Sequence, residues 1–96
     1  MKIVYLPSAR RDLTWFRKYY GIVFKAGANK AFAHYRSAIG SLKAYPMLGQ
    51  AEDDSDIRKL GIAGTPFSIY YKVEPGEIQV LRVFDHRAAP ESLRGD

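Results

Sequence analysis

Apolar residues recur at a helical spacing in the first half of the chain. The run from Lys2 to Leu6 is β-prone and stops at Pro7, and Ser8 then stands where a helix N-cap belongs. A first apolar stripe follows at Ala9, Leu13, Phe16 and Tyr20, and a second, after the break at residues 25–27, at Ala28, Ala31, Phe32, Tyr35, Ala38, Ile39 and Leu42. The pattern predicts a strand and then a hairpin of two helices, the first ending near residues 21–24 and the second closed by Pro46.

In the second half of the chain the apolar spacing changes to two. Residues 46–56 have no period and are predicted to form a loop. Three β-prone runs follow at residues 57–62, 67–73 and 78–84, separated by turn compositions at residues 64–66 and 74–76. The last run has apolar residues at both odd and even positions, which is typical of a strand that is buried on both faces. Residues 85–96 are polar and are expected to be loosely held.

The order β-α-α-β-β-β predicts an α+β fold. In this fold a helical hairpin packs on one face of a small, mainly antiparallel four-stranded sheet, and the other face is left for a partner. We expect one domain over residues 1–96, because the chain is too short for two ordinary cores. With 47% hydrophobic and 14% aromatic residues, it has enough apolar surface to fold without disulfides or a structural metal.

The residue inventory excludes several classes of chemistry. The chain has no cysteine, so a disulfide framework, thiol catalysis and cysteine-ligated zinc are excluded. His34 and His86 cannot make a metal site alone, and we expect neither a metal nor a cofactor. No signal-peptide core and no apolar run of bilayer length is present, which predicts a soluble, cytoplasmic protein.

Positive charge is concentrated outside one acidic window. The formal net charge is +5, yet residues 52–56 hold four acidic residues and no basic one. The rest of the chain, with fifteen basic and six acidic residues, therefore carries +9. Such a positive field favours polyanions and acidic peptides as partners.

Several short sequences in this order are similar to those of one family of small proteins. They are Tyr5-Leu6-Pro7-Ser8-Ala9 with Asp12-Leu13, Tyr19-Tyr20, the set Leu42, Pro46 and Gly49, Ile57-Arg58-Lys59-Leu60, Gly64 to Val73, and Ile78 to Val83 closing in His86-Arg87. Over nearly the whole chain they resemble the RelE/ParE toxin superfamily. The resemblance implies a toxin that stops growth when it is freed from its antitoxin.

The superfamily has two biochemistries, and the residues favour the gyrase-directed one. Members that cleave mRNA on the ribosome typically carry an arginine directly after the aromatic residue that opens the third strand, and often a tyrosine in the tail. Here Ser68 follows Phe67, and the tail has no aromatic residue. Gly64-Thr65-Pro66 before Phe67 resembles the ParE-like branch, which inhibits DNA gyrase without a catalytic reaction of its own. The alternative is a ribosome-dependent mRNA endoribonuclease that uses His86 as base with Arg87.

Five basic residues are the candidates for binding the target or a nucleic acid: Arg58, Lys59, Arg82, His86 and Arg87. His86 and Arg87 follow a predicted strand, where side chains can reach a partner. Arg58 and Arg82 lie on the same side of their predicted strands as apolar neighbours two residues away. The alternative for both is that their aliphatic stems only cover the sheet edge.

Trp15 and Tyr19 are the candidates for the antitoxin interface. Trp15 lies off the apolar stripe of the first predicted helix, with Tyr19 one turn later; the alternative is an ordinary core position. Two further functions remain open at this stage. One is a nucleic-acid-binding module, although the paired strand aromatics of an RNA-recognition sheet are missing. The other is a non-toxic adaptor that keeps the fold without the activity.

Overall fold

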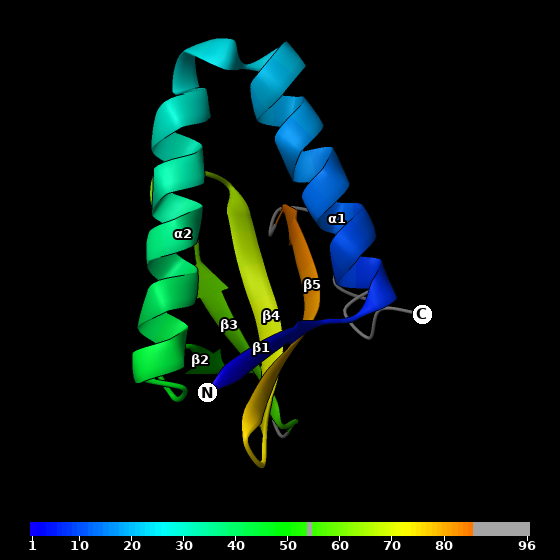
Figure 1. Cartoon of the computed structure of the whole chain (residues 1–96), viewed down its shortest axis with the longest axis vertical. Helices are drawn as coiled ribbons and strands as arrows, with labels where there is room; N and C mark the ends of the chain where they lie inside the picture. The colour runs from blue at the N-terminus through cyan, green and yellow to red at the C-terminus, as the bar shows by residue number, and fades with distance from the viewer. Residues whose placement is uncertain (54, 86–96) are drawn as a thin grey trace.

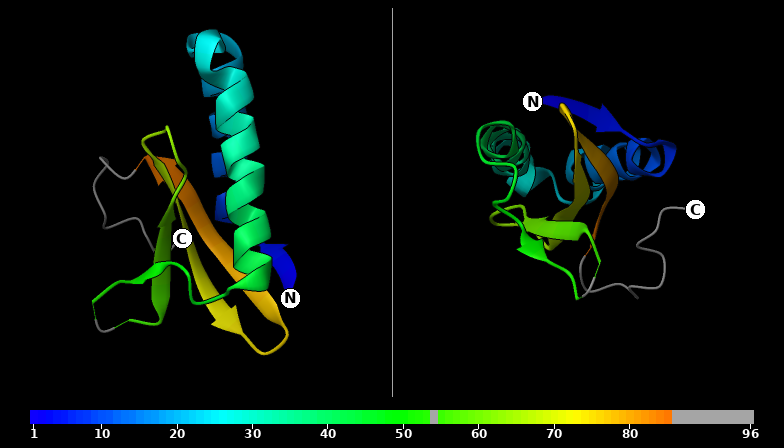
Figure 2. Two further views of the ribbon diagram at one scale, coloured as in Figure 1. Left: turned by 90° about the vertical axis from the view of Figure 1, so that its left-hand side faces the viewer. Right: turned by 90° about the horizontal axis from the view of Figure 1, so that it is seen from below.

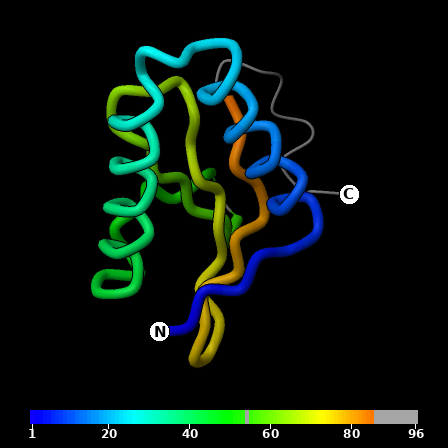
Figure 3. The backbone as a smooth tube through the Cα atoms, turned by 45° about the horizontal axis from the view of Figure 1, so that its top comes forward, coloured from blue at the N-terminus to red at the C-terminus, as the bar shows by residue number. Residues whose placement is uncertain are grey.

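A computed structural model describes residues 1–53 and 55–85. The elements, in chain order, are β1 (Lys2–Tyr5), α1 (Pro7–Lys18), a π-helical turn (Tyr19–Val23), a 3-10 turn (Lys25–Gly27), α2 (Ala28–Ala44), β2 (Gln50–Ala51), β3 (Ile57–Gly61), β4 (Phe67–Glu74) and β5 (Glu77–Asp85). The two helices run side by side and meet at a tip away from the sheet (Figures 1 and 3). No helix in these residues is long and apolar enough to cross a membrane.

The strands form one mixed sheet in the order β1-β5-β4-β3-β2. β1 pairs parallel with β5, and the other three pairings are antiparallel. Both helices lie on the same face of this sheet (Figure 2). The predicted α+β fold, with its helical hairpin on one sheet face, is therefore confirmed.

The sheet has five strands and not the four that were predicted. The additional strand, β2, lies in the segment predicted to be a loop and pairs Gln50 with Lys59 and Ala51 with Arg58. A strand of two residues is too short to show any apolar period, so the sequence pattern gave no sign of it.

The helix face of the sheet holds the main core. Phe16 lies near its centre, with ring centroids 5.1 Å from Phe67 and 5.2 Å from Tyr20. A smaller cluster of four buried side chains packs separately, and none of them is more than 9% exposed: Ile57, Tyr70, Leu81 and Phe84. These four residues are therefore not open surface, and the expectation that the second sheet face is left for a partner stays a prediction.

A β-bulge explains how β5 serves both clusters. The register places Tyr70 opposite Arg82 and Tyr71 opposite Val80, which leaves Leu81 as the extra residue. An extra residue reverses the alternation of side chains along a strand. Val80 and Val83 therefore both belong to the main core, while Leu81 joins the second cluster. The burial of β5 on both faces agrees with the sequence prediction.

The start of α1 differs from the prediction. Leu6, and not Ser8, is the N-cap, and it has no side-chain capping bond. Pro7 occupies the first helical turn, where its fixed φ angle favours a helix start and its missing N–H costs nothing. Ser8 is buried inside that turn, and its Oγ accepts a hydrogen bond from Arg11 Nη2 at 3.2 Å. Asp12 lies beyond the first turn.

Candidate functional site

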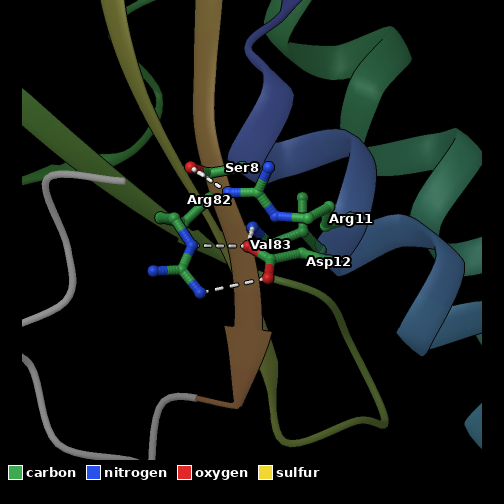
Figure 4. A network of polar contacts seen from close by, with 5 residues as sticks. All are labelled: Ser8, Arg11, Asp12, Arg82 and Val83. Atoms are coloured by element: carbon green, nitrogen blue, oxygen red, sulfur yellow. Dashed lines mark hydrogen bonds and ion pairs between the residues drawn. The ribbon is translucent and has the colours of Figure 1, made fainter. Parts of the chain in front are cut away.

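A clasp between Asp12 and β5 joins helix α1 to the sheet (Figure 4). Asp12 Oδ2 accepts a hydrogen bond from Arg82 Nε at 2.6 Å, and Oδ1 accepts one from Arg82 Nη2 at 3.1 Å. Oδ2 also accepts the backbone N–H of Val83 at 2.9 Å. The two side chains are only 14% and 17% exposed, so this ion pair is screened little by solvent.

The clasp lies where β5 loses its neighbouring strand. β1 pairs with β5 as far as Val80, whose carbonyl accepts the N–H of Leu6 at 3.0 Å. Beyond that point α1 runs along the edge of β5, and Asp12 supplies the acceptor that Val83 would otherwise lack. Arg82 also lies over the ring of Phe84, 4.8 Å from its centroid. Its guanidinium is therefore held within the protein's own structure.

The register brings together two of the five predicted target-binding residues. Lys59 pairs with Tyr70, and Tyr70 pairs with Arg82, so all three lie in one row across β3, β4 and β5. Arg58 is turned away to the segment after α2, where its Nη1 donates to the carbonyl oxygen of Gly49 at 2.7 Å. His86 and Arg87 follow the last residue of β5 in the sequence but lie outside the described residues.

The two predicted antitoxin-binding residues lie on α1 and the turn that continues it. Trp15 is 53% exposed, and its ring centroid is 6.3 Å from that of Tyr19. Tyr19 is half-buried and also packs on Phe67 at 5.8 Å. Arg11, Trp15 and Lys18 are all exposed at four- and three-residue spacing, so they share one outward face of α1. An aromatic side chain with a cation on either side is suited to an acidic, partly apolar partner.

A groove between the two helices is a second candidate surface. Its cavity volume is about 610 Å³, and it is lined by Tyr5, Leu13, Phe16, Arg17, Gly21, Phe32, Tyr35 and Arg36. The hydroxyl oxygens of Tyr5 and Tyr35 are 2.6 Å apart. Burial raises the pKa of Tyr35 far above its usual range, and the hydrogen bond with Tyr5 raises it further, so the phenol stays neutral.

Sequence reasoning assigned the groove's apolar residues to the core and missed the groove itself. A signal was present, because no acidic residue occurs anywhere between Asp12 and Glu52. Basic residues in that stretch are Arg17, Lys18, Lys25, Lys30, Arg36 and Lys43. Apart from Asp12, whose carboxylate is held by Arg82, the helical hairpin thus carries only positive charge around an apolar groove.

A third surface lies at the opposite end of α2, where three large apolar side chains are exposed. Tyr45 is 69%, Met47 is 63% and Leu48 is 51% exposed. We call these three residues the knuckle. Met47 and Leu48 fall in the segment predicted to be an aperiodic loop, whereas Tyr45 precedes it as the C-cap of α2, and sequence reasoning did not single out any of the three. The described residues contain no group of three or more metal-ligating side chains that could hold an ion.

Comparisons with known proteins point in one direction. Residues 3–90 match the family model described as "ParE toxin of type II toxin-antitoxin system, parDE". A solved chain from the chromosomal ParDE toxin-antitoxin system of P. aeruginosa is similar in structure, with a TM-score of 0.70 and 25% sequence identity over 88% of this chain and 95% of that one. No curated protein sequence matches the chain.

Proposed function

Because this chain belongs to the ParE toxin family of type II toxin-antitoxin systems, we propose that it arrests growth by poisoning DNA gyrase and that a cognate antitoxin neutralises it. The choice of target rests on which residue follows Phe67. The mRNA-cleaving relatives place an arginine there, whereas here Ser68 is 1% exposed and lies within the sheet. Cleavage needs groups that reach the phosphate and the attacking hydroxyl, and a buried serine at this position supplies neither.

Among the residues that the structure describes, the other basic candidates also support a binding role in preference to catalysis. The guanidinium of Arg58 donates to a backbone carbonyl oxygen, and that of Arg82 donates to the carboxylate of Asp12, so both groups bind other parts of the same protein. Lys59 lies beside Tyr70, and burial raises the pKa of Tyr70, so this phenol stays protonated and is not available to accept a proton. A poison that recognises the shape of a protein-DNA assembly requires no catalytic group, and this inventory fits that requirement.

We expect purified, antitoxin-free protein to inhibit DNA supercoiling by gyrase. In the Arg87→Ala variant, inhibition should weaken by about 1 to 3 kcal/mol, the range for a hydrogen-bonded charge that loses its partner. Lys25→Ala, an exposed cation at the helical tip, is the control and should change inhibition much less. The measurement is a supercoiling assay over a toxin concentration series. Cleavage of ribosome-bound mRNA by folded protein that leaves supercoiling untouched would assign the ribosome as target.

For the antitoxin we propose an acidic segment that docks on the helical hairpin. The groove with Arg17 and Arg36 at its rim and the outward face of α1 with Trp15 offer apolar anchoring surrounded only by positive charge. Acidic amphipathic helices match that combination, because their apolar face fills a groove while their charges meet the basic rim.

Trp15→Ala is expected to weaken antitoxin binding by about 2 kcal/mol or more, since exposed tryptophans are frequent hot spots. Tyr45→Ala removes another exposed aromatic residue, at the far end of α2, and should leave the affinity unchanged. Binding is measured by calorimetry on complexes purified after co-expression, at several salt concentrations. The affinity should fall steeply with salt. Two proteins that purify separately at low salt would contradict the proposal.

A further inference from the structure

The knuckle is an exposed apolar surface that the proposed antitoxin site does not include. Its three side chains lie within four residues of the chain, between the end of α2 and β2. Single exposed apolar residues are common on proteins, but a cluster of large ones marks a contact surface. Tyrosine and methionine are also among the residues enriched at protein interfaces.

Two side chains from the sheet fix the backbone that carries the knuckle. The hydroxyl of Tyr71, a fully buried residue, donates to the carbonyl oxygen of Pro46 at 2.7 Å and accepts the N–H of Gly49 at 2.8 Å. Arg58 Nη1 donates to the carbonyl oxygens of Gly49 at 2.7 Å and Met47 at 3.3 Å.

The absence of a side chain at Gly49 makes this close bracing possible. A Cβ at Gly49 would lie 2.7 Å from the ring of Tyr71 and 3.0 Å from the carbonyl oxygen of Lys59. The loop is therefore held in one conformation before any partner arrives. Such preorganisation lowers the entropy cost of binding.

The electrostatic surroundings of the knuckle differ from those of the helical hairpin. Met47 lines a hollow of about 180 Å³ together with Ser55 and Asp56 from the acidic segment and with Arg58, whose guanidinium is bound to the backbone carbonyl oxygens of Met47 and Gly49. Asp53 is exposed, and the side chain of Asp56 is 72% exposed. Lys72 is held between Asp56 at 3.5 Å and Glu74 at 3.8 Å, so this single cation is shared by two carboxylates and the group of three keeps a net negative charge.

We propose that the knuckle is the surface by which the toxin binds a protein component of its target. On that component the knuckle would fit an apolar recess bordered by basic residues. Acidic side chains beside the knuckle repel an acidic antitoxin, a nucleic-acid backbone and an anionic membrane, and they attract lysine or arginine. The protein thus has two separate surfaces of opposite character, one basic and one apolar with an acidic border. This inference rests on the proposed function, because it takes that protein component to be a gyrase subunit.

Arg58 acquires a different role in this arrangement. Its guanidinium donates to the backbone of the knuckle, so Arg58 acts on the target through the knuckle and is a positioning residue. The sequence-based prediction that Arg58 binds the target directly stays a prediction; this arrangement assigns it an indirect role instead.

The first experiment compares the wild type with the triple variant Tyr45→Ala, Met47→Ser, Leu48→Ser. Supercoiling inhibition, growth arrest on induced expression and antitoxin affinity are measured for both. The triple variant should need at least about tenfold more toxin for half-inhibition, as expected when hot-spot side chains are removed. Growth arrest should be lost, while antitoxin affinity should stay within about twofold. Ile22→Ser with Val23→Ser is the matched control for supercoiling inhibition and growth arrest, because it removes exposed apolar surface far from the knuckle and should leave both unchanged; antitoxin affinity is not compared for it, since the tip belongs to the helical hairpin.

Each other outcome has a defined meaning. A triple variant that inhibits and arrests growth like the wild type overturns the inference. So does an equal loss of antitoxin affinity, which would make the knuckle an antitoxin site. Loss of a concentration-dependent self-association that the wild type shows would assign the surface to a second copy of the chain. If the wild type arrests growth without inhibiting gyrase, the proposed target fails, and growth arrest by the triple variant alone judges the knuckle. If the wild type does neither, both proposals fail.

A double-mutant cycle tests the positioning role of Arg58. Arg58→Ala in the wild-type background should raise the half-inhibiting concentration several-fold. In the triple-variant background the same change should add nothing, because the side chains that Arg58 positions are already absent. Equal effects in both backgrounds would show that Arg58 contacts the target directly, which overturns the positioning role. Circular dichroism of each variant confirms that the fold is retained.

Discussion

Replacing Asp12 with alanine is expected to lower the free energy of unfolding by about 2 to 4 kcal/mol, somewhat below the cost of breaking a fully buried ion pair, because this pair is only partly buried. Three hydrogen bonds are lost: two from Arg82 and one from the N–H of Val83. Arg82 is left with its side chain 17% exposed and without its carboxylate. Urea denaturation followed by circular dichroism measures the change.

Two companion variants make this result interpretable. Asp56→Ala removes a carboxylate that is 72% exposed in a surface ion pair, so it should cost less than about 1 kcal/mol. Asp12→Asn keeps an acceptor for one donor and should fall between the two. An Asp12→Ala variant as stable as Asp56→Ala would show that the clasp contributes little to stability.

A comparable loss, about 3 to 5 kcal/mol, is expected for Phe16→Ala, because truncating a buried aromatic residue removes burial and leaves a cavity. Phe16 is 1% exposed. Its ring lies between the helical hairpin and the sheet, with centroids 5.1 Å from Phe67, 5.8 Å from Tyr35 and 6.1 Å from Phe32.

Phe16→Leu is the control for Phe16→Ala, since it keeps most of the volume and should cost clearly less. Both variants also remove a ring that lines the groove between the helices. We therefore expect weaker antitoxin binding in Phe16→Ala even under conditions where it is fully folded. Thermal unfolding and calorimetric titration check the two effects separately. A Phe16→Ala protein as stable as Phe16→Leu would mean that the surrounding rings close the cavity.

The elements with a long apolar period could be predicted from the sequence. Both helices and the three strands of the meander follow repeated spacings over several residues, and the structure confirms them. Predictions of where an element begins were wrong where one local preference competed with another. Ser8 is a good N-cap residue, but Pro7 is an equally good first helical residue. Since Leu6 is also hydrogen-bonded to Val80, the N-cap lies at Leu6 and the helix begins before Ser8.

The candidate surfaces were predictable only in part, because they depend on contacts between distant segments. Asp12 and Arg82 are separated by 70 positions, and nothing in either local sequence indicates that they pair. The bulge that places Leu81 in the second cluster is likewise set by the partner strand. The exposure of Trp15 was predictable because this residue departs from the apolar stripe, while its role in antitoxin binding stays a prediction. The knuckle was missed because Met47 and Leu48 lie in a segment without a period, although two adjacent large apolar residues in a loop are themselves a signal.

The parallel pairing of β1 with β5 has a consequence for the order of events during synthesis. β1 is made first and β5 last, yet β5 lies between β1 and β4 in the finished sheet. The register joins Lys2 to Glu77 and Tyr5 to Val80, contacts of very large sequence separation, which slow folding because a long loop must close before they form. Until β5 leaves the ribosome, the helical hairpin has no complete sheet to cover, and its apolar stripe is exposed. During that period the exposed stripe is open to contact with any binding partner that is already present.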